Sequence, residues 1–82
     1  MSFEGKTVII TGASRGIGYE TAKLFYAAGA RVYLTARTES NLNKLSKDLG
    51  RNAIAEVCDV GILGELERVA KKVLRDTGRI DI

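Results

Sequence analysis

The sequence predicts an α/β fold, namely one half of a doubly wound parallel sheet in three layers with strand order 3-2-1. Short apolar runs rich in β-branched residues alternate three times with longer segments whose apolar residues recur at helical spacing. The chain has 82 residues and no proline, so it allows one small domain without a linker. A β-α-β-α-β-α alternation favours a parallel sheet with right-handed crossovers, and 3-2-1 is the order of the first half of such a sheet.

The first unit is a strand, a turn and a helix. The run KTVIIT, Lys6 to Thr11, is typical of a strand buried on both faces, and Gly12 ends it. A helix is expected from Gly16 or Ile17 to Ala28, with Gly29 as its left-handed C-terminal residue. The apolar stripe expected to bury this helix comprises Ile17, Thr21, Leu24, Phe25 and Ala28.

Two further units repeat this order. A second strand, Arg31 to Ala36, precedes a helix that Thr38 can cap and Gly50 ends. A third strand, Asn52 to Cys58, precedes a helix that closes at Gly78. The stripe of the second helix comprises Leu42, Leu45 and Leu49, and that of the third comprises Leu63, Leu66, Val69, Ala70, Val73 and Leu74. The final RIDI is the expected start of a fourth strand.

Composition excludes several classes of function. The net charge of +3 comes from charges of alternating sign, so nucleic acid is not an expected partner. No apolar run approaches the roughly 20 residues of a membrane span. The chain has no histidine and a single cysteine, Cys58, so no metal constellation is expected and the compartment is predicted to be reducing and cytoplasmic.

The turn after the first strand carries the main functional signal. Gly12, Gly16 and Gly18 have the spacing G-x-x-x-G-x-G between a predicted strand and a predicted helix. Glycines there allow a sharp turn and let backbone approach a pyrophosphate, which the free N–H groups of the helix N-terminus bind. The alternative is a tight strand-to-helix turn that holds no ligand.

The segment TGASRGIG resembles the cofactor turn of the short-chain dehydrogenase/reductase family. LTAR, CDV and GRIDI resemble the ends of that family's second and third strands and the start of its fourth. The resemblance implies a Rossmann-type fold in which residues 1–82 are the N-terminal dinucleotide-binding segment. The cofactor-binding residues that it implies are Gly12, Ser14, Arg15, Gly16, Ile17, Gly18, Ala36, Arg37, Thr38, Asp59 and Val60.

The resemblance also indicates which dinucleotide is bound. Where family members that use NAD carry an acidic residue for the ribose hydroxyls, this chain has Ala36, followed by Arg37. A guanidinium pairs with a 2′-phosphate, and Arg15 in the glycine turn adds a second cation. NADP is therefore expected rather than NAD, with Asp59 contacting the adenine amino group.

The same segment contains Tyr19 and Lys23 at the Y-x-x-x-K spacing of the family's proton donor and its partner. These two lie one turn past the phosphate turn, so the match is interpreted as coincidental. The catalytic Ser, Tyr and Lys positions of the family lie beyond residue 82. The parent reaction that the resemblance implies is alcohol oxidation or carbonyl reduction. This chain alone is expected to bind the cofactor and not to catalyse that reaction.

The remaining expectations concern partners. A fragment of a reductase and one chain of a split enzyme, with a companion carrying the second half, both remain open. A rival is a self-associating structural α/β module with an empty phosphate turn. If Arg79 to Ile82 leave the first strand unpaired, that strand is an exposed edge, and a homo-oligomer through it is expected.

Overall fold

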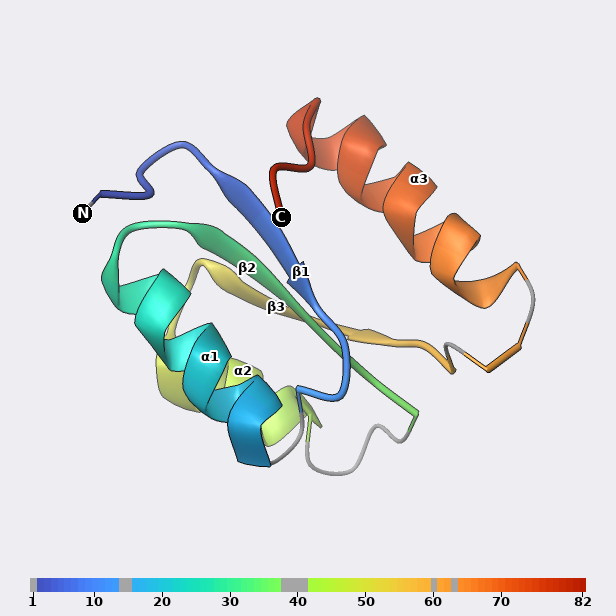
Figure 1. Cartoon of the computed structure of the whole chain (residues 1–82), viewed down its shortest axis with the longest axis horizontal. Coiled ribbons are helices and arrows are strands. Elements are labelled where there is room, and N and C mark those ends of the chain that lie inside the picture. The colour runs from blue at the N-terminus through green and yellow to red at the C-terminus, as the bar shows by residue number, and fades with distance from the viewer. Residues whose placement is uncertain (1, 14–15, 38–41, 60, 63) are drawn as a thin grey trace.

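The computed structural model describes residues 2–13, 16–37, 42–59, 61–62 and 64–82. The elements in chain order are β1 (Thr7–Ile10), α1 (Gly16–Ala27), β2 (Arg31–Ala36), α2 (Leu42–Leu49), β3 (Ala53–Val57) and α3 (Glu65–Thr77). The strands form one parallel sheet with β2 in the middle (Figure 1). The predicted alternation and strand order are confirmed, with boundaries shifted by one or two residues; Leu63 lies outside the described residues.

The sheet lies between two helical layers, with α1 and α2 on one face and α3 on the other (Figure 1). Alternate residues of each strand point to opposite faces. On the face of α1 and α2, the sheet buries Val8, Val32 and Leu34 with Ala22 and Leu42. On the other face, the core residues are Tyr33, Cys58, Val69 and Val73, with Ile9 and Ile54 packed against them.

Helix α1 does not bury the whole stripe that its periodicity predicts. Ile17 and Leu24 are 86% and 73% exposed, and the fully buried residue of this helix is Ala22. A side chain at Gly50, just after α2, would collide with the hydroxyl of Tyr26, so Tyr26 marks the flank of α1 that faces α2. At 100° per residue, Ile17 and Leu24 lie about 180° and 200° around the helix from Tyr26. Their flank therefore faces away from α2 and is uncovered.

Helix α3 shows the same asymmetry. Val69 and Val73 are fully buried as predicted, whereas Leu66 and Leu74 are 41% and 47% exposed. Arg68 and Lys72 form ion pairs with Glu56 of β3 at 3.5 and 2.7 Å, which fixes the flank of α3 that lies over β3. Leu66 lies two residues before Arg68 and six before Lys72, and Leu74 lies two after Lys72 and six after Arg68. At 100° per residue, both leucines are about 120–160° around the helix from these cations. The leucines therefore lie on the flank away from β3.

The C-terminal segment pairs with β1 on the side opposite β2. Asp81 N–H donates to the Thr7 carbonyl at 2.8 Å, and Ile9 N–H donates to the Ile82 carbonyl at 2.9 Å. The Asp81 carboxylate accepts a hydrogen bond from Thr7 N–H at 2.8 Å and binds the Arg79 guanidinium through both oxygens. The C-terminal residues therefore begin to pair with β1 as expected for a fourth strand, although residues 79–82 do not themselves form a strand. The open edge foreseen for an unpaired segment is absent at Thr7 and Ile9.

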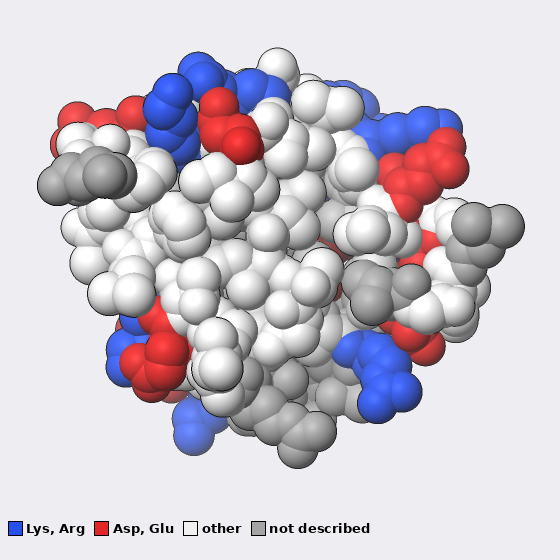
Figure 2. Space-filling view, viewed as in Figure 1, with Lys and Arg blue, Asp and Glu red and all other residues white. Residues whose placement is uncertain are grey.

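Charged side chains surround a broad uncharged area on one face of the molecule. Figure 2 shows lysine, arginine, aspartate and glutamate mainly around the rim of the view. In the same orientation, Figure 1 places β1, α1, α3 and the C-terminal end in this area. The view looks down the shortest axis, and the whole molecule measures 34 by 26 Å in this view.

The contact between Asp81 and β1 predicts a dependence on pH. The Arg79 guanidinium and the Thr7 N–H hold the pKa of the Asp81 carboxyl below its ordinary value. Because the folded-state pKa is lowered, the stabilisation is complete above about pH 4 and is lost as the pH falls through the lower, folded-state pKa. Hydrogen exchange, corrected for the intrinsic rate, should show the Thr7 amide losing protection below about pH 4.

The matched control is Asp81→Asn, which keeps the shape of the side chain and removes its titration. In this variant the protection of Thr7 should be weaker at neutral pH and insensitive to acid. An unchanged pH profile in the variant would contradict the role given to Asp81.

Candidate nucleotide-binding site

The predicted site residues come together at one edge of the sheet. Because the strands are parallel, their carboxyl ends lie on the same side, as Figure 1 shows. Gly12 follows the end of β1, Arg37 follows β2, and Asp59 follows β3. In open α/β sheets, ligands bind outside these carboxyl ends.

The glycine turn leads from β1 into α1 through two residues in the left-handed region. Gly12 has φ 62° and Gly16 has φ 63°, values that L side chains rarely adopt. Among the described residues, a Cβ atom added at either glycine would meet no heavy atom within 4 Å beyond its chain neighbours. At both positions a side chain would project into space that the described residues leave open. An open backbone turn of this kind is what a phosphate-binding turn requires.

Gly18 has a different role. A Cβ atom at this position would overlap the Gly12 carbonyl oxygen and come within 3.3 Å of the Ala13 Cα. The first turn of α1 therefore packs directly on the backbone of the turn that precedes it. The sequence predicted that glycines here let backbone approach a pyrophosphate. At Gly18 the structure shows instead that the missing side chain lets the helix pack on the turn.

The turn is held in place by β2. Ala13 N–H donates to the Thr35 carbonyl at 2.9 Å, and the Thr35 hydroxyl donates to the Ile10 carbonyl at 3.0 Å. Ala13 and Thr35 are both fully buried. Sequence reasoning missed these two residues. The available signal was a polar side chain in an otherwise apolar strand, since a buried hydroxyl needs a hydrogen-bond partner.

The start of α1 is suited to an anion. The free N–H groups and the dipole of a helix N-terminus favour negative charge. The first turn of α1 contains no acidic residue that would oppose it. Together with the open space at Gly12 and Gly16, this means that the described residues fit a pyrophosphate.

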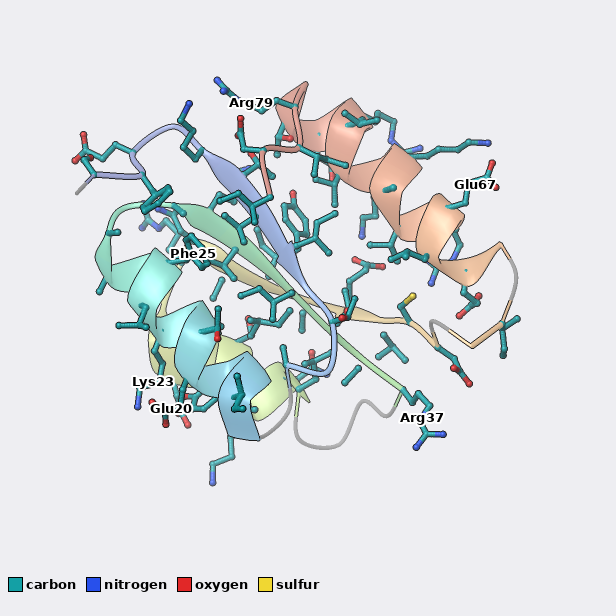
Figure 3. The ribbon with its side chains drawn as sticks, viewed as in Figure 1. Glu20, Lys23, Phe25, Arg37, Glu67 and Arg79 are labelled. Carbon is teal, nitrogen blue, oxygen red and sulfur yellow. The ribbon has the colours of Figure 1, made fainter. Side chains whose placement is uncertain are left out.

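Arg37 lies at the end of β2 and is exposed. Figure 3 shows its side chain directed away from the sheet at the carboxyl edge. Among the described residues it forms no ion pair within 4 Å. Ala36 before it is 7% exposed, and its carbonyl accepts a hydrogen bond from Cys58 N–H at 2.9 Å. This bond brings the ends of β2 and β3 together, so Arg37 and Asp59 border the same edge.

Asp59 uses one carboxylate oxygen to form its own turn. Gly61 N–H donates to Asp59 Oδ1 at 2.9 Å, and Ile62 N–H donates to the Asp59 carbonyl at 3.0 Å. Within the described residues, these bonds leave Oδ2 as the carboxylate oxygen available to accept from another donor. The turn interpretation and the adenine interpretation of Asp59 are therefore compatible.

Of the other predicted site residues, the structure describes only Ile17. Ile17 is in the first turn of α1 and is exposed. Four predicted residues lie outside the described residues, namely Ser14, Arg15, Thr38 and Val60.

Tyr19 and Lys23 form a local surface arrangement on α1. The Lys23 ammonium lies 5.6 Å from the centre of the Tyr19 ring and 3.5 Å from a Glu20 carboxylate oxygen. Figure 3 shows Glu20 and Lys23 together on the outer side of the helix. Lys23 is exposed, whereas Tyr19 is half-buried. These surface contacts explain the positions of the Tyr19 and Lys23 side chains, and neither contact requires a role in proton transfer.

Cys58 is a buried core residue. It is 2% exposed, and burial followed by the charge of Glu65 raises the pKa of its thiol. A raised pKa keeps the thiol protonated and unreactive.

The described part of the chain shows neither a group of metal-binding side chains nor a membrane-spanning helix. No group of three or more histidine, cysteine, aspartate or glutamate residues could hold a metal ion there. None of the described helices has the length and apolar character needed to cross a membrane.

The sequence profile of the short chain dehydrogenase family matches residues 6–82. This chain belongs to that family. It is 39% identical over 82 residues to the 3-oxoacyl-(acyl-carrier-protein) reductase of Escherichia coli, covering 100% of this chain and 34% of the relative. It is 40% identical over 85 residues to an uncharacterised oxidoreductase of Mycobacterium tuberculosis, covering 96% of this chain and 25% of the relative.

A solved structure of a similar protein supports the fold. The 3-ketoacyl-(acyl-carrier-protein) reductase of Brucella melitensis, solved in complex with NADH, matches with a TM-score of 0.90 at 30% identity. The match covers 98% of this chain and 33% of that protein. This chain therefore spans about a third or less of the length of these relatives, and its Rossmann-type half-sheet is the part that they share.

The two kinds of glycine predict different consequences of substitution. Gly18→Ala places a methyl group against the Gly12 carbonyl and should destabilise the fold by about 1–3 kcal/mol. Gly16→Ala meets no neighbouring atom and should cost only about 1–2 kcal/mol, from its left-handed backbone. The free energy of unfolding in urea measures the stability of both variants.

Nucleotide binding separates the two variants further. Gly16→Ala should fold and bind dinucleotide at least about tenfold more weakly, because its methyl group fills the space in front of the turn. A Gly16→Ala variant with parental affinity would show that the phosphate does not lie at this turn.

Proposed function

We propose that this chain is the NADP(H)-binding segment of a short-chain oxidoreductase. The observation that carries the proposal is the exposed Arg37, which forms no ion pair among the described residues and follows the neutral Ala36 at the edge where the glycine turn opens. The complex of the Brucella melitensis reductase with NADH supports a nicotinamide dinucleotide as the ligand class. The choice of NADP rests on residues of this chain.

The charge at the end of β2 favours a 2′-phosphate. A carboxylate at the position of Ala36 would accept hydrogen bonds from the ribose hydroxyls of NAD and would repel a phosphate. Alanine can do neither, and the adjacent guanidinium can form two parallel hydrogen bonds to phosphate oxygens. Arg15, in the sequence of the glycine turn, would add a second cation.

Each part of the edge then has a role in holding the cofactor. The turn at Gly12 and Gly16, with the N-terminus of α1, would hold the pyrophosphate, and Arg37 the 2′-phosphate. Asp59 Oδ2 would accept from the adenine amino group. When bound, the dinucleotide supplies or accepts a hydride.

The proposed parent reaction is oxidation of an alcohol or reduction of a carbonyl. The family's catalytic Ser, Tyr and Lys have no counterpart placed for proton transfer among the described residues, and the Tyr19 and Lys23 pair is accounted for by surface contacts. The segment is therefore proposed to bind and orient the adenine half of the cofactor without turnover. With its single thiol buried, its proposed location is the cytoplasm.

Calorimetric titration tests the choice of cofactor. The chain should bind NADPH at least about tenfold more tightly than NADH, since a charge-assisted hydrogen bond contributes about 1.5–3 kcal/mol. Arg37→Asp should abolish or reverse this preference. Arg31→Asp, at the opposite end of the same strand, makes the same change of charge and should leave the preference unaltered.

The outcomes of this titration separate the alternatives. Equal affinities for both dinucleotides in the parent chain would refute the specificity while leaving the nucleotide-binding function intact. Binding of neither would favour the structural module with an empty turn.

The assignment of Tyr19 predicts a neutral variant. Tyr19→Phe keeps the ring that Lys23 contacts and removes only the hydroxyl, so NADPH affinity should stay within about twofold of the parent. Neither chain should oxidise NADPH in the presence of a carbonyl substrate, as followed by the nicotinamide absorbance. Turnover by the parent that the Phe variant loses would overturn the assignment.

A further inference from the structure

The peptide group between Val57 and Cys58, at the end of β3, is held from both sides. Its N–H, on Cys58, donates to the Ala36 carbonyl at 2.9 Å, and its C=O, on Val57, accepts from Arg68 Nη2 at 3.0 Å. In a trans peptide these two groups point in opposite directions. Since the N–H points towards β2, the carbonyl points to the outer side of β3, the edge strand of the described sheet. The Arg68 guanidinium therefore supplies the partner that an edge strand otherwise lacks.

The guanidinium is itself fixed by two carboxylates. Arg68 Nη1 lies 3.5 Å from Glu56 Oε1, and Arg68 Nε lies 3.7 Å from Glu65 Oε2. Lys72 Nζ lies 2.7 Å from the other oxygen of Glu56. Both cations thus hold Glu56, but in the part of the chain that the structure describes Arg68 bonds to the backbone of β3 and Lys72 does not. A guanidinium has five donors in a rigid plane, which lets it hold a carbonyl and carboxylates together.

Asp59 follows this peptide group directly. Its Oδ1 accepts from Gly61 N–H at 2.9 Å, which forms a short turn and leaves Oδ2 for the adenine amino group. Because this turn starts immediately after Cys58, the orientation of the peptide group before it decides where Oδ2 lies. The bond from Cys58 N–H to Ala36 also sets the position of Asp59 relative to Arg37.

We propose that Arg68 is a positioning residue for the recognition of adenine: by holding the Val57 carbonyl, it keeps Asp59 Oδ2 where the adenine amino group can donate to it. The inference rests on the proposed function, because it requires a dinucleotide at this edge. An exposed ion pair contributes little to stability, and the Arg68 side chain is 49% exposed. The loss of its guanidinium should therefore affect the geometry at Asp59 more than the stability of the fold.

Calorimetric titration with two dinucleotides tests this role. One is NADPH, and the other is its hypoxanthine analogue, in which an oxygen replaces the adenine amino group. The parent should bind NADPH at least about tenfold more tightly, because the analogue cannot donate to Asp59. Arg68→Met keeps the aliphatic stem and should bind NADPH about tenfold more weakly than the parent does, but the analogue no more weakly, so that the preference disappears. A general defect in folding would instead lower both affinities by the same factor.

The matched control is Lys72→Met. It removes the other cation that holds Glu56, with the same change of net charge on the same helix, and it leaves the bond to the Val57 carbonyl in place. This variant should keep the parental preference. If circular dichroism shows that Arg68→Met does not fold, Arg68→Lys is the second variant. It keeps the positive charge but lacks the planar fork, so it should lose most of the preference.

Amide hydrogen exchange of the nucleotide-free chain separates positioning from a direct contact with the cofactor. If Arg68 holds the end of β3, the Cys58 amide should exchange at least about tenfold faster in Arg68→Met than in the parent. The Ala13 amide, which donates to the Thr35 carbonyl, should exchange as in the parent. A lost preference with unchanged exchange at Cys58 would indicate a direct contact and overturn the positioning role.

Three further results would overturn the proposal while NADPH binding by the parent upholds the proposed function. They are a folded Arg68→Met variant with the parental preference, an Arg68→Lys variant with the full preference, and a Lys72→Met variant that loses as much preference as Arg68→Met. If the parent binds neither dinucleotide, the proposed function fails, and the role of Arg68 in recognising adenine fails with it.

Discussion

The contact between Gly18 and the backbone at Gly12 is the constraint on which the site depends. Because no side chain separates them, α1 starts directly on the turn that leaves β1. The hydroxyl of Thr35 and the amide of Ala13 then fix this turn to β2. With the helix start and the strand end held in this way, the free N–H groups of α1 point to the carboxyl edge, where Arg37 and Asp59 also lie. One close approach of backbone thus organises the candidate anion site.

Much of the fold follows from the sequence because each element has its own periodic signal. Alternating strands and helices of this length allow few topologies, and parallel strands necessarily bring Gly12, Arg37 and Asp59 to one edge. The tie through Thr35 was not predictable in the same way. Threonine is β-branched and therefore common in strands, so the sequence gives no sign of a special role for Thr35. Only the structure shows that its hydroxyl is buried and donates a hydrogen bond to the Ile10 carbonyl. The periodicity of apolar residues predicts the strands and helices, whereas the side-chain contacts between them are seen only in the structure.

The exposed residues of α1 and α3 show the other limit of sequence reasoning. Apolar residues recur at helical spacing in both helices, but this spacing does not identify which of them another element covers. Four members of these stripes are exposed, namely Ile17, Leu24, Leu66 and Leu74. In this structure the sheet and the neighbouring elements cover one side of each helix, and the flanks on the β1 side stay open. The relatives are three or more times as long as this chain, so the shared half-sheet in them is accompanied by much more polypeptide. The same four residues therefore show where the burial prediction from periodicity was wrong.

The most direct test of the central claim is a titration of ¹⁵N-labelled chain with NADPH, followed by amide chemical shifts. If the carboxyl edge binds the dinucleotide, the amides of Gly12, Gly16 and Gly18 should shift in proportion to occupancy, together with those of Arg37 and Asp59. Amides at the opposite edge, such as Gly5 and Gly29, should not move. Shifts at Gly5 and Gly29 without shifts in the glycine turn would contradict the account, as would a spectrum that saturating NADPH leaves unchanged.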